Sequence, residues 1–90
     1  MEEFLKDLGF RIGSKGFIFW IEAIEIYKKE KKPITEIYKE IAKNHLTTKS
    51  NVDYLMKYSR LSGTRKIRTY YEYNDRLTNT IVLHLLTNFK

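Results

Sequence analysis

The side chains of this 90-residue chain that could recognise another molecule are concentrated in residues 49–68. Asn can pair with adenine through two hydrogen bonds, Ser can bond several bases, and Asp can accept a bond from cytosine N4. Lys and Arg suit backbone phosphates, and Tyr can donate to a phosphate or stack on a sugar. The candidates for base contacts are Ser50, Asn51 and Asp53. The candidates for phosphate or sugar contacts are Lys49, Tyr54, Lys57, Arg60, Arg65, Lys66 and Arg68. These residue types predict contacts with double-stranded DNA.

The net charge of +6 is distributed unevenly along the chain. Residues 1–48 carry a net charge of +1, and residues 69–90 carry none. Residues 49–68 hold six Lys and Arg against Asp53 alone, a net charge of +5. Such a local excess is typical of a surface that meets phosphates. The alternative is a solvated basic surface that only keeps the protein in solution.

Two predicted helices must position these residues, one on each side of the short polar segment 45–48. Apolar residues recur in both with the 3.6-residue period of a helix. The first helix would bury Ile34, Ile37, Tyr38, Ile41 and Ala42, and the second would bury Val52, Leu55, Met56 and Ser59. Thr47 or Thr48 can cap the second helix, which we expect at about 48–61. Its outward side would then present Lys49, Ser50, Asn51, Asp53, Tyr54, Lys57 and Tyr58.

The spacing within these two helices is typical of a helix-turn-helix. Ala42 is the small residue that allows a close crossing, and Val52 and Leu55 follow it by ten and thirteen positions. Leu46 departs from the pattern, because Gly is usually favoured at that point of the turn. The second helix of the motif contacts base edges from its N-terminal part, so the pattern favours sequence-specific DNA binding. The alternative is an ordinary helical hairpin that buries a core and touches no nucleic acid.

The remaining sequence predicts one all-α domain, residues 1–90, with about five helices. Further helices are expected at 2–8, at 15–29 with Ser14 as the cap, and from Thr78, Asn79 or Thr80 onward. The last helix would place Ile81, Val82, Leu85, Leu86 and Phe89 at helical spacing, either in the core or in a dimer contact. Residues 65–74 alternate with a period of two, which predicts an extended arm or a loop. The cations of that arm would lie along the DNA backbone.

Several classes of function find no support in the sequence. The chain has no cysteine, and its histidines, His45 and His84, lie on different elements, so no metal site is expected. No glycine-rich loop follows a strand and no nucleophile lies near a base, so we expect no cofactor, no small-molecule ligand and no enzyme activity. No apolar run approaches the roughly 20 residues that span a bilayer. The absence of cysteine fits a reducing cytoplasm, which is the expected location.

Several blocks resemble the C-terminal effector domain of the stage-zero sporulation master regulator of spore-forming Firmicutes. The most specific block consists of residues 37–43 (IYKEIAK), Thr47, Thr48, Ser50 and Val52. Residues 8–10, 15–17 and 22–25 are similar to the LGI/V, KGY and REAI elements of that family, and Thr78, Asn79 and Ile81 to the segment before its last helix. The resemblance implies an all-helical DNA-binding domain that reads promoter boxes with a helix-turn-helix, often as tandem dimers. A homodimer on DNA and a role in transcriptional regulation are therefore expected.

The chain also departs from that family. Asn51, Asp53 and Tyr54 stand where the family has Arg, Glu and Arg, so the resemblance implies the fold but not the same DNA sequence preference. Family members carry an N-terminal phosphoacceptor receiver domain, so this chain would be an excised domain or a stand-alone relative. The alternative function is a protein–protein interaction module that kept the effector-domain fold and lost DNA reading, which the outward Tyr54 and Tyr58 favour. Membrane-surface binding is disfavoured, because the core needs the apolar side of the basic helix.

Overall fold

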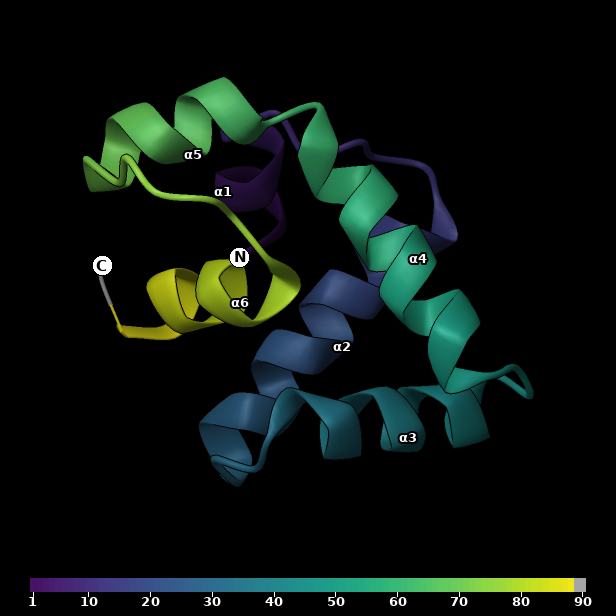
Figure 1. Cartoon of the computed structure of the whole chain (residues 1–90). Coiled ribbons are helices and arrows are strands. Elements are labelled where there is room, and N and C mark those ends of the chain that lie inside the picture. Colours follow the sequence, from purple (N-terminus) through teal and green to yellow (C-terminus); the bar gives the residue numbers. More distant parts are fainter. Residues whose placement is uncertain (89–90) are drawn as a thin grey trace.

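The computed structural model describes residues 1–88, and the regular structure in them is entirely helical (Figure 1). The six helices in this part are α1 (Glu2–Asp7), α2 (Lys15–Lys29), α3 (Ile34–Asn44), α4 (Lys49–Leu61), α5 (Thr64–Tyr71) and α6 (Asn79–Asn88). The predicted all-α fold is confirmed, with one helix more than the five expected. The predicted helices occur in the predicted order, and the additional helix, α5, follows α4.

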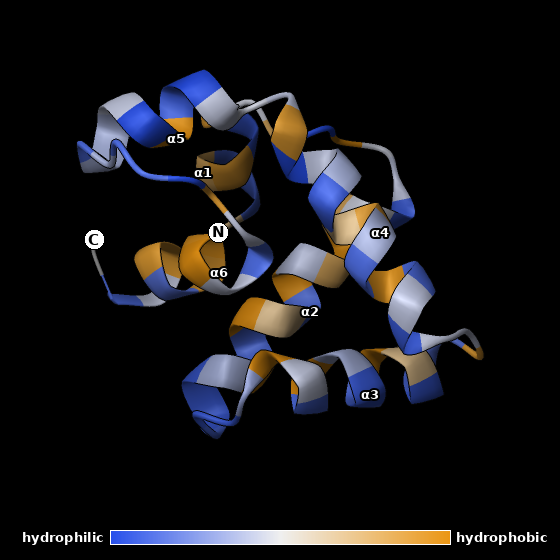
Figure 2. Cartoon of the chain, in the orientation of Figure 1, coloured by the Kyte–Doolittle hydropathy of each residue, from blue (hydrophilic) through white to orange (hydrophobic). Residues whose placement is uncertain are grey.

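Helix α2 is the centre around which the others pack. Ser14 caps it by accepting a hydrogen bond from the backbone N–H of Phe17, as expected. Phe19, Trp20 and Ala23 are at most 1% exposed, and α3, α4 and α6 all lie against this helix. Figure 2 shows α6 mostly in hydrophobic colours and α5 mostly in hydrophilic ones. The apolar periodicity of residues 15–29 therefore identified the core helix correctly.

Helix α4 lies very close to α2, and a glycine makes that approach possible. A Cβ atom added at Gly16 would lie 2.2 Å from the carbonyl oxygen of Leu55 and 2.9 Å from the Cβ of Ser59. One turn along α2, the indole Nε1 of Trp20 donates a buried hydrogen bond of 2.8 Å to the carbonyl oxygen of Met56. The predicted inward side of α4 is confirmed, because Val52, Met56 and Ser59 are buried and Leu55 is partly buried.

The connection between α1 and α2 secures the other end of α4. The backbone N–H of Arg11 donates to the carbonyl oxygen of Ser59, and the Ser62 hydroxyl donates to that of Gly9. Gly63 approaches the backbone of Leu8 so closely that a Cβ would lie 2.3 Å from its carbonyl oxygen. The C-terminal end of α4 is therefore held by hydrogen bonds and a close backbone approach from the segment that connects α1 and α2.

The prediction of an extended arm or loop at residues 65–74 is wrong, because Thr64–Tyr71 forms helix α5. Its apolar residues lie at helical spacing, with Ile67 fully buried and Tyr71 partly buried four positions later. The ring of Tyr70 packs edge-on against Phe4 of α1, with centroids 5.3 Å apart. Burial against α1 favours the helix, whereas the alternation of apolar and polar residues had indicated a strand.

Helix α6 returns to the core, which was one of the two predicted roles for the last helix. Val82, Leu83, Leu85 and Leu86 are at most 6% exposed. Thr78 caps this helix, because its hydroxyl accepts a hydrogen bond of 3.2 Å from the N–H of Ile81. Phe89, which was expected on its apolar side, lies outside the described residues. None of the helices in residues 1–88 is long and apolar enough to cross a membrane.

Candidate nucleic-acid interface

The turn between α3 and α4 has the backbone geometry of a Schellman motif. Leu46 adopts a left-handed conformation, with φ of +54°, and the N–H of Thr47 donates to the carbonyl oxygen of Ala42. Gly is the residue usually found in this conformation, because it has no Cβ to crowd the following carbonyl. Leu46 takes it nevertheless, with 95% of its surface exposed. Leu46 therefore adopts the left-handed conformation for which Gly is usually favoured.

The first turn of α4 is ordered by two threonines. The Thr48 hydroxyl accepts a hydrogen bond of 3.1 Å from the N–H of Asn51 and so caps the helix. The Thr47 hydroxyl accepts a bond of 2.8 Å from the Nδ2 group of Asn51. The Asn51 side chain is exposed, and its oxygen and second Nδ2 hydrogen remain available to a ligand. Thr47 therefore positions the residue that was predicted to pair with adenine.

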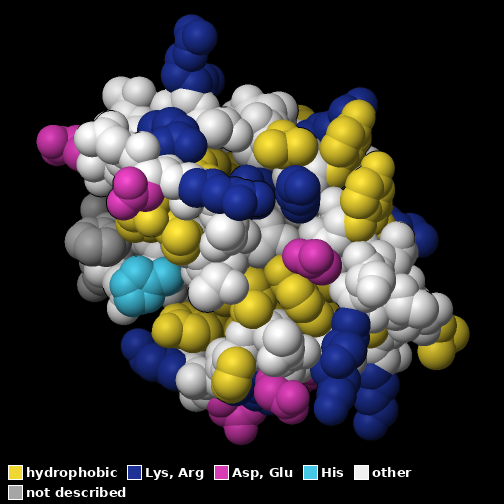
Figure 3. Space-filling model, viewed as in Figure 1, with side chains coloured by type: hydrophobic (Ala, Val, Ile, Leu, Met, Phe, Trp, Pro, Cys, Tyr) yellow, Lys and Arg dark blue, Asp and Glu magenta, His cyan; other side chains and the backbone are white. Residues whose placement is uncertain are grey.

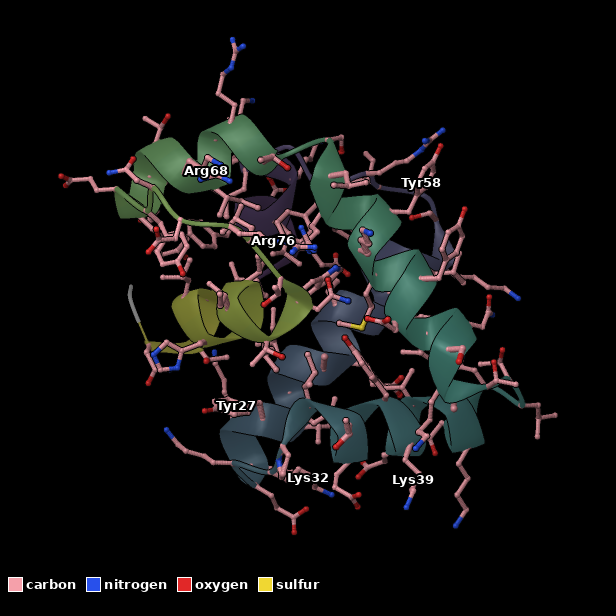
Figure 4. The ribbon with its side chains drawn as sticks, viewed as in Figure 1. Tyr27, Lys32, Lys39, Tyr58, Arg68 and Arg76 are labelled. Atoms are coloured by element: carbon pink, nitrogen blue, oxygen red, sulfur yellow. The ribbon has the colours of Figure 1, made fainter. Side chains whose placement is uncertain are left out.

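The outward side of α4 is exposed as predicted. Its exposed residues are Lys49, Ser50, Asn51, Asp53, Tyr54, Lys57 and Tyr58. Tyr54 and Tyr58 are 60% and 50% exposed, and their rings stack nearly parallel with centroids 6.1 Å apart. The guanidinium of Arg11 lies 5.4 Å from the centre of the Tyr58 ring. Figure 4 shows Tyr58 on the outer side of α4, and the stack places Tyr54 on the same side one turn earlier.

Asp53 has internal partners that the sequence did not reveal. Its Oδ1 atom accepts hydrogen bonds from the Tyr38 hydroxyl of α3, at 2.8 Å, and from the Nδ2 group of Asn79 of α6, at 3.0 Å. Asn79 Nδ2 also lies 2.9 Å from the Tyr38 hydroxyl oxygen. The carboxylate predicted to meet cytosine therefore joins three helices instead of projecting freely outward.

Arg60, which was predicted to contact the DNA backbone, is buried in the structure. Only 5% of Arg60 is exposed, and its Nε donates a hydrogen bond of 2.6 Å to the Oδ1 atom of Asn79. Burial lowers the pKa of the guanidinium, and the nearby Tyr38 and Asp53 partly oppose this effect. Arg60 follows Asp53 by two helical turns and shares its side of α4, which the start of α6 covers. We refer to Tyr38, Asp53, Arg60 and Asn79 as the polar junction.

The polar junction encloses two ionisable side chains, because Tyr38 and Arg60 are only 8% and 5% exposed. Burial raises the pKa of the Tyr38 hydroxyl well above its ordinary value, and its hydrogen bond to Asn79 partly opposes this effect. From its position in the pattern, Tyr38 was predicted as a core residue and Asn79 as one of three possible caps, and both also lie in the blocks of the family resemblance. A polar residue at the start of a very apolar helix was the one available sign of the role of Asn79.

The cations of α5 do not form an extended arm. Arg65 and Lys66 are exposed beside a hollow between α1 and α5, which Phe4 and Tyr70 also line. Arg68 is partly buried, and its Nη1 donates a hydrogen bond of 2.7 Å to the carbonyl oxygen of Asp75. Figure 3 shows Lys and Arg side chains over α5, over the segment leading to α6 and over α4 on one face of the molecule. The structure therefore presents the basic residues on helices and a short loop.

The two histidines lie apart and have local partners. The Nε2 atom of His45 is 2.9 Å from Oε2 of Glu22, and its ring packs edge-on against Phe19. The Nδ1 atom of His84 is 3.1 Å from Nδ2 of Asn88. Among residues 1–88, no group of three His, Cys, Asp or Glu side chains is placed to hold a metal ion.

No family model, no curated protein and no solved structure matches this chain. The resemblance to the sporulation-regulator effector domain therefore stays a prediction that rests on the sequence blocks. The exposed side of α4, with its ordered first turn, is the surface whose side chains could recognise another molecule.

Proposed function

We propose that this protein binds double-stranded DNA in a sequence-specific manner, as a regulator of transcription, with α4 in the major groove. The observation that carries the proposal is the uncovered side of α4, which begins at a capped N-terminus and presents Lys49, Ser50, Asn51 and Lys57 together. An α-helix fits the major groove, and base contacts of such helices come from their N-terminal residues.

The local geometry supports α3 and α4 as a helix-turn-helix. The left-handed residue after α3 and the capped start of α4 give a tight connection, with four residues between the helices. Contact with α2 fixes α4 through Gly16, so the exposed side is presented by a rigid support. This arrangement and the sequence blocks agree with the effector-domain family as the origin of the fold.

The structure refines which residues we assign to DNA. Asn51, held by Thr47, is the candidate for adenine, and Ser50 lies beside it. Lys49 and Lys57 suit phosphates on either side of the groove. Asp53 leaves the base-reading set, because its Oδ1 atom is engaged in the polar junction. The Oδ1 atom of Asp53 is engaged by Tyr38 and Asn79. The other polar side chains on the outward side of α4 are neutral or positively charged.

The test begins by selecting bound sequences from a pool of random duplexes at two salt concentrations. An enriched sequence with steep salt dependence is the expected result, with a log–log slope of roughly −0.9 for each neutralised phosphate. Asn51→Ala should then weaken binding to the selected site by about 1–3 kcal/mol and leave binding to random DNA nearly unchanged. Equal losses on both DNAs would remove Asn51 from base reading.

Asn44→Ala is the matched control for that substitution. Asn44 is also exposed, but its Nδ2 group lies 3.4 Å from Glu22 of α2 and it is not part of α4. We expect the control to leave both affinities unchanged. A loss as large as that of Asn51→Ala would mean that the effect reflects the turn between the helices, not a base contact.

The second candidate function is a protein–protein interaction module, and the stacked Tyr54 and Tyr58 favour it. Aromatic residues are enriched in the anchors of protein interfaces. An interface of this kind would show weak salt dependence, and no duplex would be enriched in the selection. A homodimer on DNA remains part of the main proposal, and sedimentation of the protein on the selected duplex would measure its stoichiometry.

A further inference from the structure

A hollow of about 370 Å³ lies between α4 and the start of α6, on the outer side of the polar junction. Its polar lining consists of Asp53, Lys57, Arg60, Arg76, Thr78 and Asn79. Helix α4 supplies the first three, and the segment entering α6 supplies the others. Figure 4 shows Arg76 on that segment, between α5 and α6 and beside α4. The hollow thus brings together cations that are well separated in the sequence.

Arg60 brings unused hydrogen-bond donors to this hollow. Within residues 1–88, its only side-chain hydrogen bond is the one from Nε to Asn79, and neither Nη group has an acceptor. Only 5% of the surface of Arg60 is exposed. Its Nη atoms are not among the buried side-chain atoms that lack a hydrogen-bond partner, so they keep contact with solvent. The two Nη groups of this lining residue are therefore available to donate to an anion in the hollow.

The charges around the hollow also favour an anion. Lys57 and Arg76 are exposed at its edge, and with Arg60 they outnumber the single carboxylate of Asp53. That carboxylate already accepts two hydrogen bonds through Oδ1. The first turn of α6 adds partial positive charge, as the N-terminus of a helix does. The hydrogen bond from Arg68 to the Asp75 carbonyl oxygen holds the segment that carries Arg76.

We propose that this hollow binds a phosphate group, with the Nη groups of Arg60 as a two-pronged donor and with Arg76 and Lys57 closing over it. Arg suits this role because its planar guanidinium matches two phosphate oxygens. On the proposed function, on which this inference rests, the group is a backbone phosphate beside the groove that α4 enters. Arg60 would then act from the α6 side of the helix, and Asn79 would be its positioning residue.

The first experiment uses the complete chain without DNA. Inorganic phosphate and dimethyl phosphate are titrated separately, while NMR follows the Nε–H signal of Arg60 and the amides of Asn79 and Thr80. Saturable shifts of these signals with either probe would support the site. Shifts that rise linearly, or that are spread equally over all Lys and Arg residues, would mean an adventitious ion only and would overturn the proposal.

The second experiment tests the site with Arg76→Ala, which alters an exposed residue and should leave the fold intact. We expect the phosphate-induced shifts at Arg60 to weaken and the salt slope of duplex binding to fall by about 1. Arg65→Ala is the matched control, because Arg65 is exposed on α5 and does not line the hollow. Equal effects of the two substitutions on the Arg60 shifts would overturn the proposal.

The two experiments also separate this inference from the proposed function. Saturable phosphate binding without any binding of duplex DNA would support the site, assign it to free phosphate and refute DNA binding. Duplex binding that leaves the Arg60 signal unshifted would support DNA binding and overturn the phosphate site. Arg60→Lys gives a final check, because it keeps the positive charge but removes the two Nη donor groups. It should abolish the saturable shifts of Asn79 and Thr80.

Discussion

The two flanks of α4 are held in different ways. On the α2 flank, Gly16 brings two helix backbones together, and one hydrogen bond from Trp20 accompanies the apolar packing. On the α6 flank, the polar junction joins Asp53 and Arg60 to Tyr38 and Asn79 through side-chain hydrogen bonds. The first flank fixes where α4 lies. The second fixes the direction of its charged side chains.

This difference bears on how a basic helix is held in place while one of its sides stays exposed. Steric contact sets the distance between two helices but does not decide where a carboxylate or a guanidinium points. Hydrogen bonds fix the direction of such a side chain. Removing one partner of a buried hydrogen bond lowers stability strongly, because the other partner is left unpaired. The α6 flank engages the Oδ1 atom of Asp53 and keeps Arg60 at the edge of a hollow. We expect substitutions on the two flanks to have different consequences for stability and binding.

Gly16→Ala should have the largest effect on stability. The added Cβ would lie 2.2 Å from the Leu55 carbonyl oxygen, so α2 and α4 must move apart along the crossing. We expect the free energy of unfolding to fall by about 3 kcal/mol or more, the upper end of overpacking effects. Urea denaturation followed by circular dichroism measures this change.

Gly13→Ala is the control for that substitution. Gly13 has a φ of +79°, but an added Cβ would find no atom within 4 Å. Only backbone strain should then act, at about 1–2 kcal/mol. If Gly16→Ala cost no more than this control, the two helices would not approach as closely as described.

Asn79→Ala should have the next largest effect, because one side chain serves three partners. Its removal leaves Arg60 without its Nε acceptor and Asp53 without one of its donors. We expect a loss of about 2–4 kcal/mol in the free energy of unfolding, since both groups carry charge. Asn88→Ala, on the same helix but at an exposed position, should change stability by less than about 0.5 kcal/mol. Equal effects would show that the polar junction does not stabilise the α6 flank.

The sequence predicted the features that depend on neighbouring residues and missed those that depend on residues far apart in the chain. Helix α2 was predicted at its observed bounds, because a capping serine and a broad apolar stripe lie within its own residues. The inward and outward sides of α4 were predicted for the same reason. The polar junction was missed because Asn79 reaches Asp53 across 26 positions and Arg60 across 19. Helix α5 was missed because its contact with α1 overrides an alternating pattern.

Tyr38→Phe tests the α6 flank through pH. The pKa of Tyr38 is raised in the folded protein, chiefly by burial, so the native state keeps this proton where the unfolded chain loses it. Stability from this group is present below about pH 10, the ordinary pKa of Tyr, and is lost as the pH rises further. We expect the substitution to cost about 1 kcal/mol at pH 8 and to reduce the decline in stability between pH 9 and 11.

Part of that decline should remain in Tyr38→Phe. Burial also raises the pKa of Tyr71, to about 12, and hydrogen bonds to Glu40 and Glu30 raise that of Lys32 to about 12. Both shifts have the same sign as that of Tyr38. Urea denaturation at pH 8, 9, 10 and 11 measures the two curves. Parallel curves would show that Tyr38 keeps an ordinary pKa and that the α6 flank does not bury it.

Leu46→Gly should have the smallest effect, because Leu46 belongs to neither flank of α4. Its left-handed conformation costs a residue with a Cβ about 1–2 kcal/mol, and Gly escapes that cost but loses more entropy on folding. With 95% of the side chain exposed, little packing is lost. We expect a net gain in stability of up to about 1 kcal/mol, independent of pH between 8 and 11, as measured by urea denaturation. Glu72→Gly is the parallel case, with φ of +52° at the end of α5. A loss of stability in Leu46→Gly alone would show that the turn, like the two flanks, depends on contacts of its side chain.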